Sequence, residues 1–319
     1  MVMDEFSLID KFFKPLDLKR DDVLLGIGDD AACLHVPEGM NILVSTDTLV
    51  AKVHFLPDWD AYDIAYRSVM VSVSDLAAMA AQPCWATLAL TLPQMEPSWL
   101  ESFARGLSDS LKQFNIALIG GDTTCGPLSI TLTVFGQAPC RQEVRRSGAK
   151  PGDLILVSGN LGAAALAVKF LDAQDIPSSD QATLMHKLLH PTPRIDLIKF
   201  LRLYATAAID ISDGLSADLN HICTASGVGA CLNLDAIPIE PLVKHYYRNK
   251  AVDLALTGGD DYELCFTVPE LKFDSLMSTL KQAGVVCYPI GVIEKQLGLR
   301  IKTAENLYHE IVPKGYLHF

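Results

Sequence analysis

Aspartates follow short apolar runs at four places in this sequence, and their chemistry points to metal binding. Each run has the pattern of a strand and ends in one or two carboxylates. Gly26 and Gly28 precede the first pair and allow a sharp turn that aims it into a cleft; a simple turn with a helix cap is the alternative. The carboxylates delivered in this way are Asp29 and Asp30, Asp47, Asp122, and Asp210 with Asp213.

A seventh aspartate, Asp75, lies in an apolar segment. Between residues 64 and 81 the only other charged residue is Arg67, so the sequence predicts a buried helix. An ionised carboxylate is costly there unless it meets a metal ion, an arginine or backbone donors. We interpret Asp75 as facing a metal; the alternative is that it caps the start of a new helix.

The seven aspartates form a set of hard oxygen ligands, and few histidines and no paired cysteines accompany them. Such a set suits Mg²⁺ or Mn²⁺ better than zinc. Because Mg²⁺ is usually bound by few carboxylates together with substrate phosphates, so many acids predict several ions around a polyphosphate. The sequence has no Walker A motif, protein-kinase signature or Gly-x-Ser-x-Gly elbow. Phosphoryl transfer needs no covalent nucleophile, because positioning and charge neutralisation carry most of it.

The spacing of apolar residues predicts the strands and helices that position these acids. A glycine turn at 158–162 before a helix could bind an anion or could serve packing alone, and both readings stay open. The glycine pair Gly258-Gly259 precedes Asp260 and Asp261. We predict helices at 6–13, 64–81, 99–114, 163–171, 191–207 and 215–226, and strands at 31–36, 42–45, 85–92, 116–119, 130–135, 154–157, 208–211 and 264–268.

The length of 319 residues favours two domains, with the boundary in the Pro- and Gly-bearing stretch 138–152. A net charge of −12 argues against nucleic-acid and anionic-membrane partners. Eight scattered cysteines without a C-x-x-C pair are interpreted as reduced, mostly buried thiols. With no signal peptide and no long apolar run, we expect a soluble cytoplasmic protein.

Eight motif-like segments follow one another along the chain. They are Gly26-Ile-Gly-Asp-Asp-Ala-Ala, Ser45-Thr-Asp-Thr-Leu-Val, Ser74-Asp-Leu-Ala-Ala-Met-Ala, Gly120-Gly-Asp-Thr-Thr, Arg146-Ser-Gly-Ala, Asp210-Ile-Ser-Asp-Gly-Leu, Gly258-Gly-Asp-Asp-Tyr-Glu and Gly315-Tyr-Leu-His-Phe. In this order they resemble the thiamine-monophosphate kinase family. The family belongs to a superfamily that includes aminoimidazole ribonucleotide synthetase, and Ser45–Val50 with the chain end favour the kinase.

The resemblance implies transfer of the ATP γ-phosphoryl group to thiamine monophosphate, directly and with several Mg²⁺ ions. It also implies an α/β (α+β) fold of two domains in a homodimer. Residues 1–138 would bind ATP and metal and dimerise through a mixed sheet that forms a barrel across the dimer. Residues 150–319 would form an α/β domain that completes the site.

The resemblance also assigns roles by position. Asp30, Ser45, Thr46, Asp47, Asp75, Asp122, Asp210 and Asp213 would hold metal, with Asp29 less certain. Gly121, Asp122, Arg146 and Ser212 would contact ATP, and His54, Asp260 and Tyr316 would contact thiamine monophosphate.

The chain departs from the family pattern at Asp260, where glutamate is usual, and at Leu317, where aspartate is usual. Both departures lie in the implied substrate region. Three other functions stay open: a synthetase like aminoimidazole ribonucleotide synthetase, a non-catalytic regulator that binds nucleotide and Mg²⁺, and a metal-dependent phosphatase.

Overall fold

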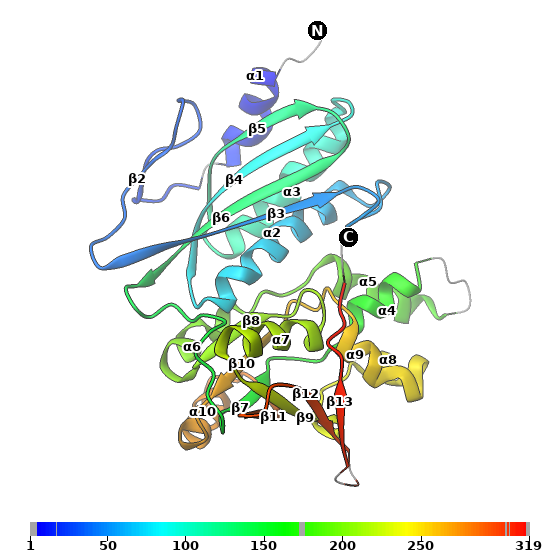
Figure 1. Cartoon of the computed structure of the whole chain (residues 1–319). Coiled ribbons are helices and arrows are strands. Elements are labelled where there is room, and N and C mark those ends of the chain that lie inside the picture. Colours follow the sequence, from blue (N-terminus) through cyan, green and yellow to red (C-terminus); the bar gives the residue numbers. More distant parts are fainter. Residues whose placement is uncertain (1–4, 17, 172–175, 304, 306, 317–319) are drawn as a thin grey trace. The chain divides into compact units, whose positions relative to one another are not determined.

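The computed structural model describes residues 5–16, 18–171, 176–303, 305 and 307–316. The chain forms two compact units (Figure 1). The first unit contains the chain up to Leu76 together with Ala81–Arg141, and the second contains Ala77–Ala80 together with the chain from Gln142 onward. This mixed α/β architecture confirms the predicted fold class.

A four-stranded sheet is the centre of the first unit. Its strands lie in the order β3-β6-β4-β5, with β4 and β5 parallel and the other neighbours antiparallel. Helices α2 and α3 lie on one face of this sheet (Figure 1). The bounds are β3 Met40–Val50, β4 Gln82–Leu92, β5 Ala117–Cys125, β6 Ser129–Pro139, α2 Ala61–Ala78 and α3 Pro97–Gln113.

Sequence periodicity explains these elements. In β6, Ile130, Leu132 and Val134 alternate with threonines and are fully buried, as a strand with one covered face requires. Most of the α2 side chains are buried, which confirms the buried helix predicted for this segment.

The N-terminal segment begins with α1 Glu5–Leu8, followed by a single π-helical turn Ile9–Phe13 and a 3₁₀ turn Lys14–Leu16. The helix predicted at 6–13 is therefore present with an irregular second half. Two short strands, β1 Val23–Leu25 and β2 Cys33–Leu34, pair antiparallel. Val23 of β1 and Leu34 of β2 pack with Trp85 and Ile119 of the sheet.

The second unit is built on a seven-stranded sheet in the order β13-β12-β9-β11-β7-β10-β8. All neighbours are antiparallel except β12 and β9, which are parallel. The strands are β7 Leu154–Val157, β8 Ala207–Asp210, β9 Gly229–Asn233, β10 Leu264–Val268, β11 Tyr288–Glu294, β12 Gly298–Lys302 and β13 Tyr308–Ile311.

The helices of this unit are α4 Ala163–Lys169, α5 Ser178–Leu189, α6 Ile198–Tyr204, α7 Leu215–Ser226, α8 Pro241–Tyr247, α9 Ala251–Thr257 and α10 Glu270–Gln282. Short 3₁₀ turns stand at Ile195–Leu197, Leu234–Ala236 and Arg248–Lys250.

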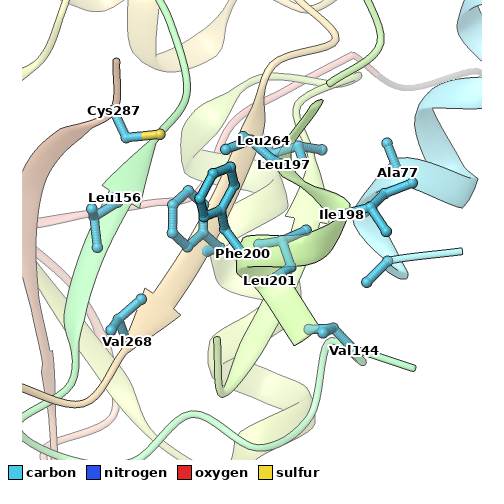
Figure 2. Packing of buried hydrophobic residues seen from close by; sticks show 14 of the residues in the cluster. Ala77, Val144, Leu156, Leu197, Ile198, Phe200, Leu201, Leu264, Val268 and Cys287 are labelled. Atoms are coloured by element: carbon cyan, nitrogen blue, oxygen red, sulfur yellow. The ribbon is translucent and has the colours of Figure 1, made fainter. Parts of the chain in front are cut away.

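A hydrophobic cluster of this unit packs around Phe200 (Figure 2). Phe266 belongs to the same cluster. The cluster joins residues from strands and helices that are far apart in sequence, among them Leu156, Leu197 and Leu264. Ala77 and Ala78, the last two residues of α2, also belong to it.

The structure corrects several predicted bounds. The strand predicted at 42–45 continues to Val50, and that predicted at 116–119 continues to Cys125, so Asp47 and Asp122 lie within strands. The helix predicted at 191–207 is shorter, because Pro191 and Pro193 precede a 3₁₀ turn and α6 ends at Tyr204. In the described part of the chain, no helix is both long and apolar enough to cross a membrane.

Candidate functional site

Asp47 and Asp75 form a pair of carboxylates between β3 and α2. Because side chains alternate along a strand, Ser45 and Asp47 share the face of β3 that carries the buried Leu43 and Leu49. The Ser45 hydroxyl donates a hydrogen bond to Asp75 Oδ2, so the strand and the helix meet at these side chains. Asp75 lies inside α2, which excludes the alternative that it caps a helix.

The surroundings of Asp47 fit a cation. Burial, and then the charge of Asp75, raise the pKa of Asp47 to about 6, while the Ser72 hydroxyl acts in the opposite direction. The Oδ2 atom of Asp47 is buried and has no hydrogen-bond partner. Since a buried, unpaired carboxylate oxygen beside a second carboxylate is unfavourable, these oxygens suit a hard divalent cation such as Mg²⁺.

Thr46, which the resemblance placed among the metal ligands, presents its side chain on the opposite face of β3. Its hydroxyl is 2.9 Å from the hydroxyl of Thr133 on β6, and Thr48 pairs in the same way with Thr131. The structure therefore does not bring the Thr46 hydroxyl together with Ser45 and Asp47.

A second group of acids lines a cavity of about 590 Å³ in the first unit. Asp29 and Asp30 enter it from the turn after β1, and Asp122 enters it from β5. The backbone N–H of Asp30 donates to Asp29 Oδ1 at 2.9 Å, which holds the Asp29 carboxylate against the backbone of the turn. Lys14 supplies a positive charge at the same cavity and pairs with Asp10 at 3.1 Å.

Gly121, an implied ATP contact, is required by close packing of β5 on β4. A Cβ atom at this position would lie 1.9 Å from the carbonyl oxygen of Leu88. At Gly120 the nearest atom to a Cβ would be 4.0 Å away. The glycine pair thus belongs to a strand, and only its second member is needed for packing.

His54, an implied substrate contact, lies in the turn after β3. Its Nδ1 accepts a hydrogen bond of 3.0 Å from the backbone N–H of Val50. In the neutral ring this assignment leaves the proton on Nε2. The ring is half-buried and is held at one edge by its own turn.

In the second unit, Asp210 ends β8 and is almost fully buried, and the turn that follows holds Ser212 and Asp213. Asp218 of α7 reaches back, and its Oδ2 accepts the N–H groups of Asp213 at 3.1 Å and Gly214 at 3.0 Å. Burial raises the pKa of Asp218 to about 7, with the charge of Asp213 adding to it against these hydrogen bonds.

Asp260 and Tyr316 reach this same turn through their backbones. The N–H of Asp260 donates to the Ser212 carbonyl at 2.8 Å, and the N–H of Tyr316 donates to the Asp213 carbonyl at 3.1 Å. The chain before Tyr316 is held because Lys314 exchanges two hydrogen bonds with Ser216. The structure therefore brings Asp213, Asp260 and Tyr316 together; Leu317 lies outside the described residues.

Arg146, the remaining implied ATP contact, lies on the segment beside β8. The backbone N–H of Ala208 donates to the carbonyl of the preceding residue, Arg145, at 3.0 Å. The Arg146 carbonyl accepts from the Ser226 hydroxyl at 3.3 Å, and its side chain is exposed.

The glycine turn at 158–162 is explained by contacts within the protein. Both carboxylate oxygens of the half-buried Asp261 accept the N–H of Gly162, at 3.0 and 2.9 Å. A Cβ atom on Gly159 would lie 2.2 Å from the Glu263 carboxylate. The protein's own carboxylate thus takes the position that an anion would need, and of the two readings the structure supports packing.

The structure describes three sets of the predicted acids, two in the first unit and one in the second. These are Asp47 with Asp75, Asp29 and Asp30 with Asp122, and Asp210 with Asp213. Within the described ranges, no three His, Cys, Asp or Glu side chains converge as a cluster that could hold a metal ion. Carboxylate pairs of this kind match Mg²⁺ sites in which substrate phosphates and water supply the remaining ligands.

Sequence reasoning missed the residues that hold the turns in place. Asp218, Asp261 and Glu263 each accept hydrogen bonds that fix a segment next to an implied site residue. Arg194 pairs with Glu263 at 2.8 Å. Asp261 and Glu263 lie inside the segment Gly258–Glu263 already singled out, and Asp218 lies three residues after the segment that ends at Leu215. Nothing in the spacing showed which carboxylate faces the protein and which faces a ligand.

Comparisons with known proteins agree with this architecture. Residues 28–138 match the N-terminal domain model of AIR synthase related proteins, and residues 150–303 match the C-terminal one. Thiamine-monophosphate kinase of Escherichia coli K12 is 49% identical over 324 residues, covering 100% of this chain and 99% of that protein.

Solved structures extend the comparison. The crystal structure of thiamine-monophosphate kinase from Stenotrophomonas maltophilia K279a has a TM-score of 0.86 and 44% identity, covering 94% of this chain and 97% of that one. AaThiL complexed with AMPPCP and TMP has a TM-score of 0.79 and 30% identity, covering 99% and 97%.

Proposed function

The chain belongs to the thiamine-monophosphate kinase family, and we propose that it transfers the γ-phosphoryl group of ATP to thiamine monophosphate. The products are thiamine diphosphate and ADP. The observation that carries this proposal is the full-length similarity to a named kinase at 49% identity. The arrangement of carboxylates supports it, because phosphoryl transfer between two anions needs metal ligands and no covalent nucleophile.

The reaction joins an oxygen of the acceptor phosphate to the γ-phosphorus of ATP, and the bond to ADP breaks in line. The acceptor phosphate is already ionised near neutral pH, so no side chain has to remove a proton. When bound, Mg²⁺ neutralises phosphate charge and lowers the repulsion between the two substrates. The protein's own residues have to hold the acceptor phosphate and the γ-phosphate of ATP in line for the transfer.

We assign the metal-binding role to the carboxylates and to the Ser45 hydroxyl. The orphaned oxygen of Asp47 beside Asp75 supports this assignment in the first unit. The Thr46 hydroxyl pairs with Thr133, so Thr46 stays in the proposed set without support from its side chain. The residues proposed to hold Mg²⁺ are Asp29, Asp30, Ser45, Thr46, Asp47, Asp75, Asp122, Asp210 and Asp213.

We further propose that Gly121, Asp122, Arg146 and Ser212 contact ATP, and that His54, Asp260 and Tyr316 contact thiamine monophosphate. The approach of Asp260 and Tyr316 to the Ser212–Asp213 turn supports the second assignment. The shorter Asp260 keeps the carboxylate that the family's usual glutamate provides. We expect the enzyme to act in the cytoplasm, where ATP is available.

A homodimer is proposed because one face of the first unit's sheet exposes apolar and threonine side chains. On β3, Ile42 is 45% exposed and Val44 is 56% exposed, and Thr46 and Thr48 continue the same face. Edge strands and apolar sheet faces of this kind favour association with a second chain. Closure of the sheet into a barrel across two chains stays a prediction.

The first test is the formation of ADP and thiamine diphosphate from ATP and thiamine monophosphate, with and without Mg²⁺. Thiamine and an aminoimidazole precursor serve as rival acceptors, and an arm without ATP detects phosphatase activity. We expect both products in equal amounts and only with the metal ion. ADP release with another acceptor alone would move the function elsewhere in the superfamily, and no turnover with any acceptor would favour the regulator.

A further inference from the structure

We propose that Arg194 is a positioning residue that holds the loop Gly258–Glu263 and, through it, Asp260. The inference rests on the proposed function, because it assigns Arg194 to a loop whose Asp260 contacts thiamine monophosphate. Arg194 lies in the segment between α5 and the 3₁₀ turn Ile195–Leu197, outside all the motifs that the sequence analysis singled out.

Arg194 and Glu263 form the centre of a compact network. Arg194 Nη1 donates to Glu263 Oε2 at 2.8 Å and also to the Ser158 carbonyl. The Ser158 hydroxyl donates to the same carboxylate oxygen at 2.5 Å, and it accepts the N–H of Leu264 at 2.7 Å. The two charged side chains are only 13% and 19% exposed, so this contact is poorly screened by solvent.

Glu263 passes this constraint along the loop. Its carbonyl accepts the N–H of Ile211 at 2.8 Å, and the N–H of Tyr262 donates to the Ile211 carbonyl at 2.9 Å. The N–H of Asp260 then donates to the Ser212 carbonyl at 2.8 Å. The loop is therefore aligned against the Asp210–Asp213 turn, with Glu263 at its fixed end.

The backbone of this loop needs such a constraint. Asp260 has φ +68° and Tyr262 has φ +50°, both in the left-handed region that non-glycine residues avoid. Residues held there persist only when their surroundings enforce the conformation. Loosening Glu263 should allow the loop to relax and should move the Asp260 carboxylate.

Arg194 is itself held rigidly. Its Nε and Nη2 donate to the two carboxylate oxygens of Asp196, at 3.1 and 3.0 Å. Leu197 and Leu264, which follow Arg194 and Glu263 closely in sequence, share one hydrophobic cluster with Leu156 (Figure 2). A guanidinium can serve both carboxylates and a carbonyl at once, whereas a lysine ammonium lacks this planar fork.

The test begins with Arg194→Lys, which keeps the charge but not the fork. We expect the KM for thiamine monophosphate to rise about tenfold, because small displacements of a substrate-binding group are costly, while the KM for ATP changes by less than about twofold. Hydrogen exchange of the peptide containing residues 258–263 should become faster in the free protein.

A double variant, Arg194→Met with Glu263→Gln, removes both charges and so avoids an unpaired buried charge. We expect it to fold and still to show the raised KM for thiamine monophosphate. The matched control is Arg300→Met with Glu294→Gln, an ion pair of the same unit in which Arg300 is buried, Glu294 is half-buried and the charged atoms are 2.5 Å apart. That control should change thermal stability without changing this KM.

Wild-type KM values and wild-type exchange rates in the folded double variant would overturn the proposal, and so would an equal rise of KM in the control. If the wild-type protein does not phosphorylate thiamine monophosphate, the proposed function fails. Exchange in residues 258–263 then still decides whether Arg194 holds the loop, so the two failures are distinguishable.

Discussion

The carboxylate of Asp47 is buried beside Asp75, and one of its oxygens has no protein donor. Because its pKa in the folded protein, about 6, is above the ordinary value of 3.8, folding favours the protonated form. Stability from this group is fully present below pH 3.8 and is lost as the pH rises through 6. A metal ion would compete with that proton.

We expect Asp47→Asn to separate stability from function. Without metal at pH 8, the variant should be more stable than the wild type by up to about 3 kcal/mol, because it removes the buried like charge, and the difference should shrink toward pH 5. Turnover with Mg²⁺ should fall by about a hundredfold or more. Urea unfolding in chelator and the kinase assay measure the two effects.

Asp58→Asn is the matched control, since Asp58 is an exposed carboxylate of the same unit. Asp58→Asn should change neither the stability without metal nor the turnover with Mg²⁺. Loss of folded Asp47→Asn protein with normal activity per folded molecule would argue against a metal role for Asp47.

At the scale of elements, β5 shows how a motif can belong to a different local structure from the one that its composition indicates. The glycine pair before Asp122 has the composition of a turn, yet β5 runs through it because β4 pairs with it in parallel. Likewise, polar residues from Ser45 to Thr48 resemble the end of a strand, but pairing with β6 continues to Val50. In both cases the end of the strand is determined by pairing with a neighbouring strand, and the local sequence pattern contains no information about that neighbour.

Gly121→Ala should destabilise the first unit by about 3 kcal/mol, because its Cβ would overlap the Leu88 carbonyl. Gly120→Ala, one residue earlier in the same strand, has room for a Cβ and should change stability by less than about 1 kcal/mol. Thermal unfolding of both variants measures the difference. Equal effects of the two substitutions would contradict the close approach of β5 to β4.

The sequence was informative where the type of a residue, or the periodicity of apolar residues, was sufficient to identify a feature. The buried α2, the alternating β6 and the acidic residues were all predictable from it. The orientation of Thr46 and the anchoring role of Glu263 were not, because each depends on a neighbour distant in sequence, Thr133 or Arg194.

At the scale of the whole molecule, association is expected to use the exposed face of β3. Val44→Lys places a charge at the centre of that face and should convert a dimer into a monomer. Leu271→Lys, at a fully exposed apolar residue of α10 in the second unit, should leave the protein a dimer in solution. Analytical ultracentrifugation decides; a dimer that persists in Val44→Lys would place the interface elsewhere.

The strand order of the second unit also has a consequence for synthesis on the ribosome. Among the strands that the structure describes, β7 pairs only with β10 and β11, and β10 begins about a hundred residues later in the chain. At roughly 5–20 residues per second, the nascent β7 therefore waits on the order of ten seconds for its first partner. Its apolar side chains are open to chaperones throughout that interval, whereas the strands of the first unit have all been translated before β7 emerges.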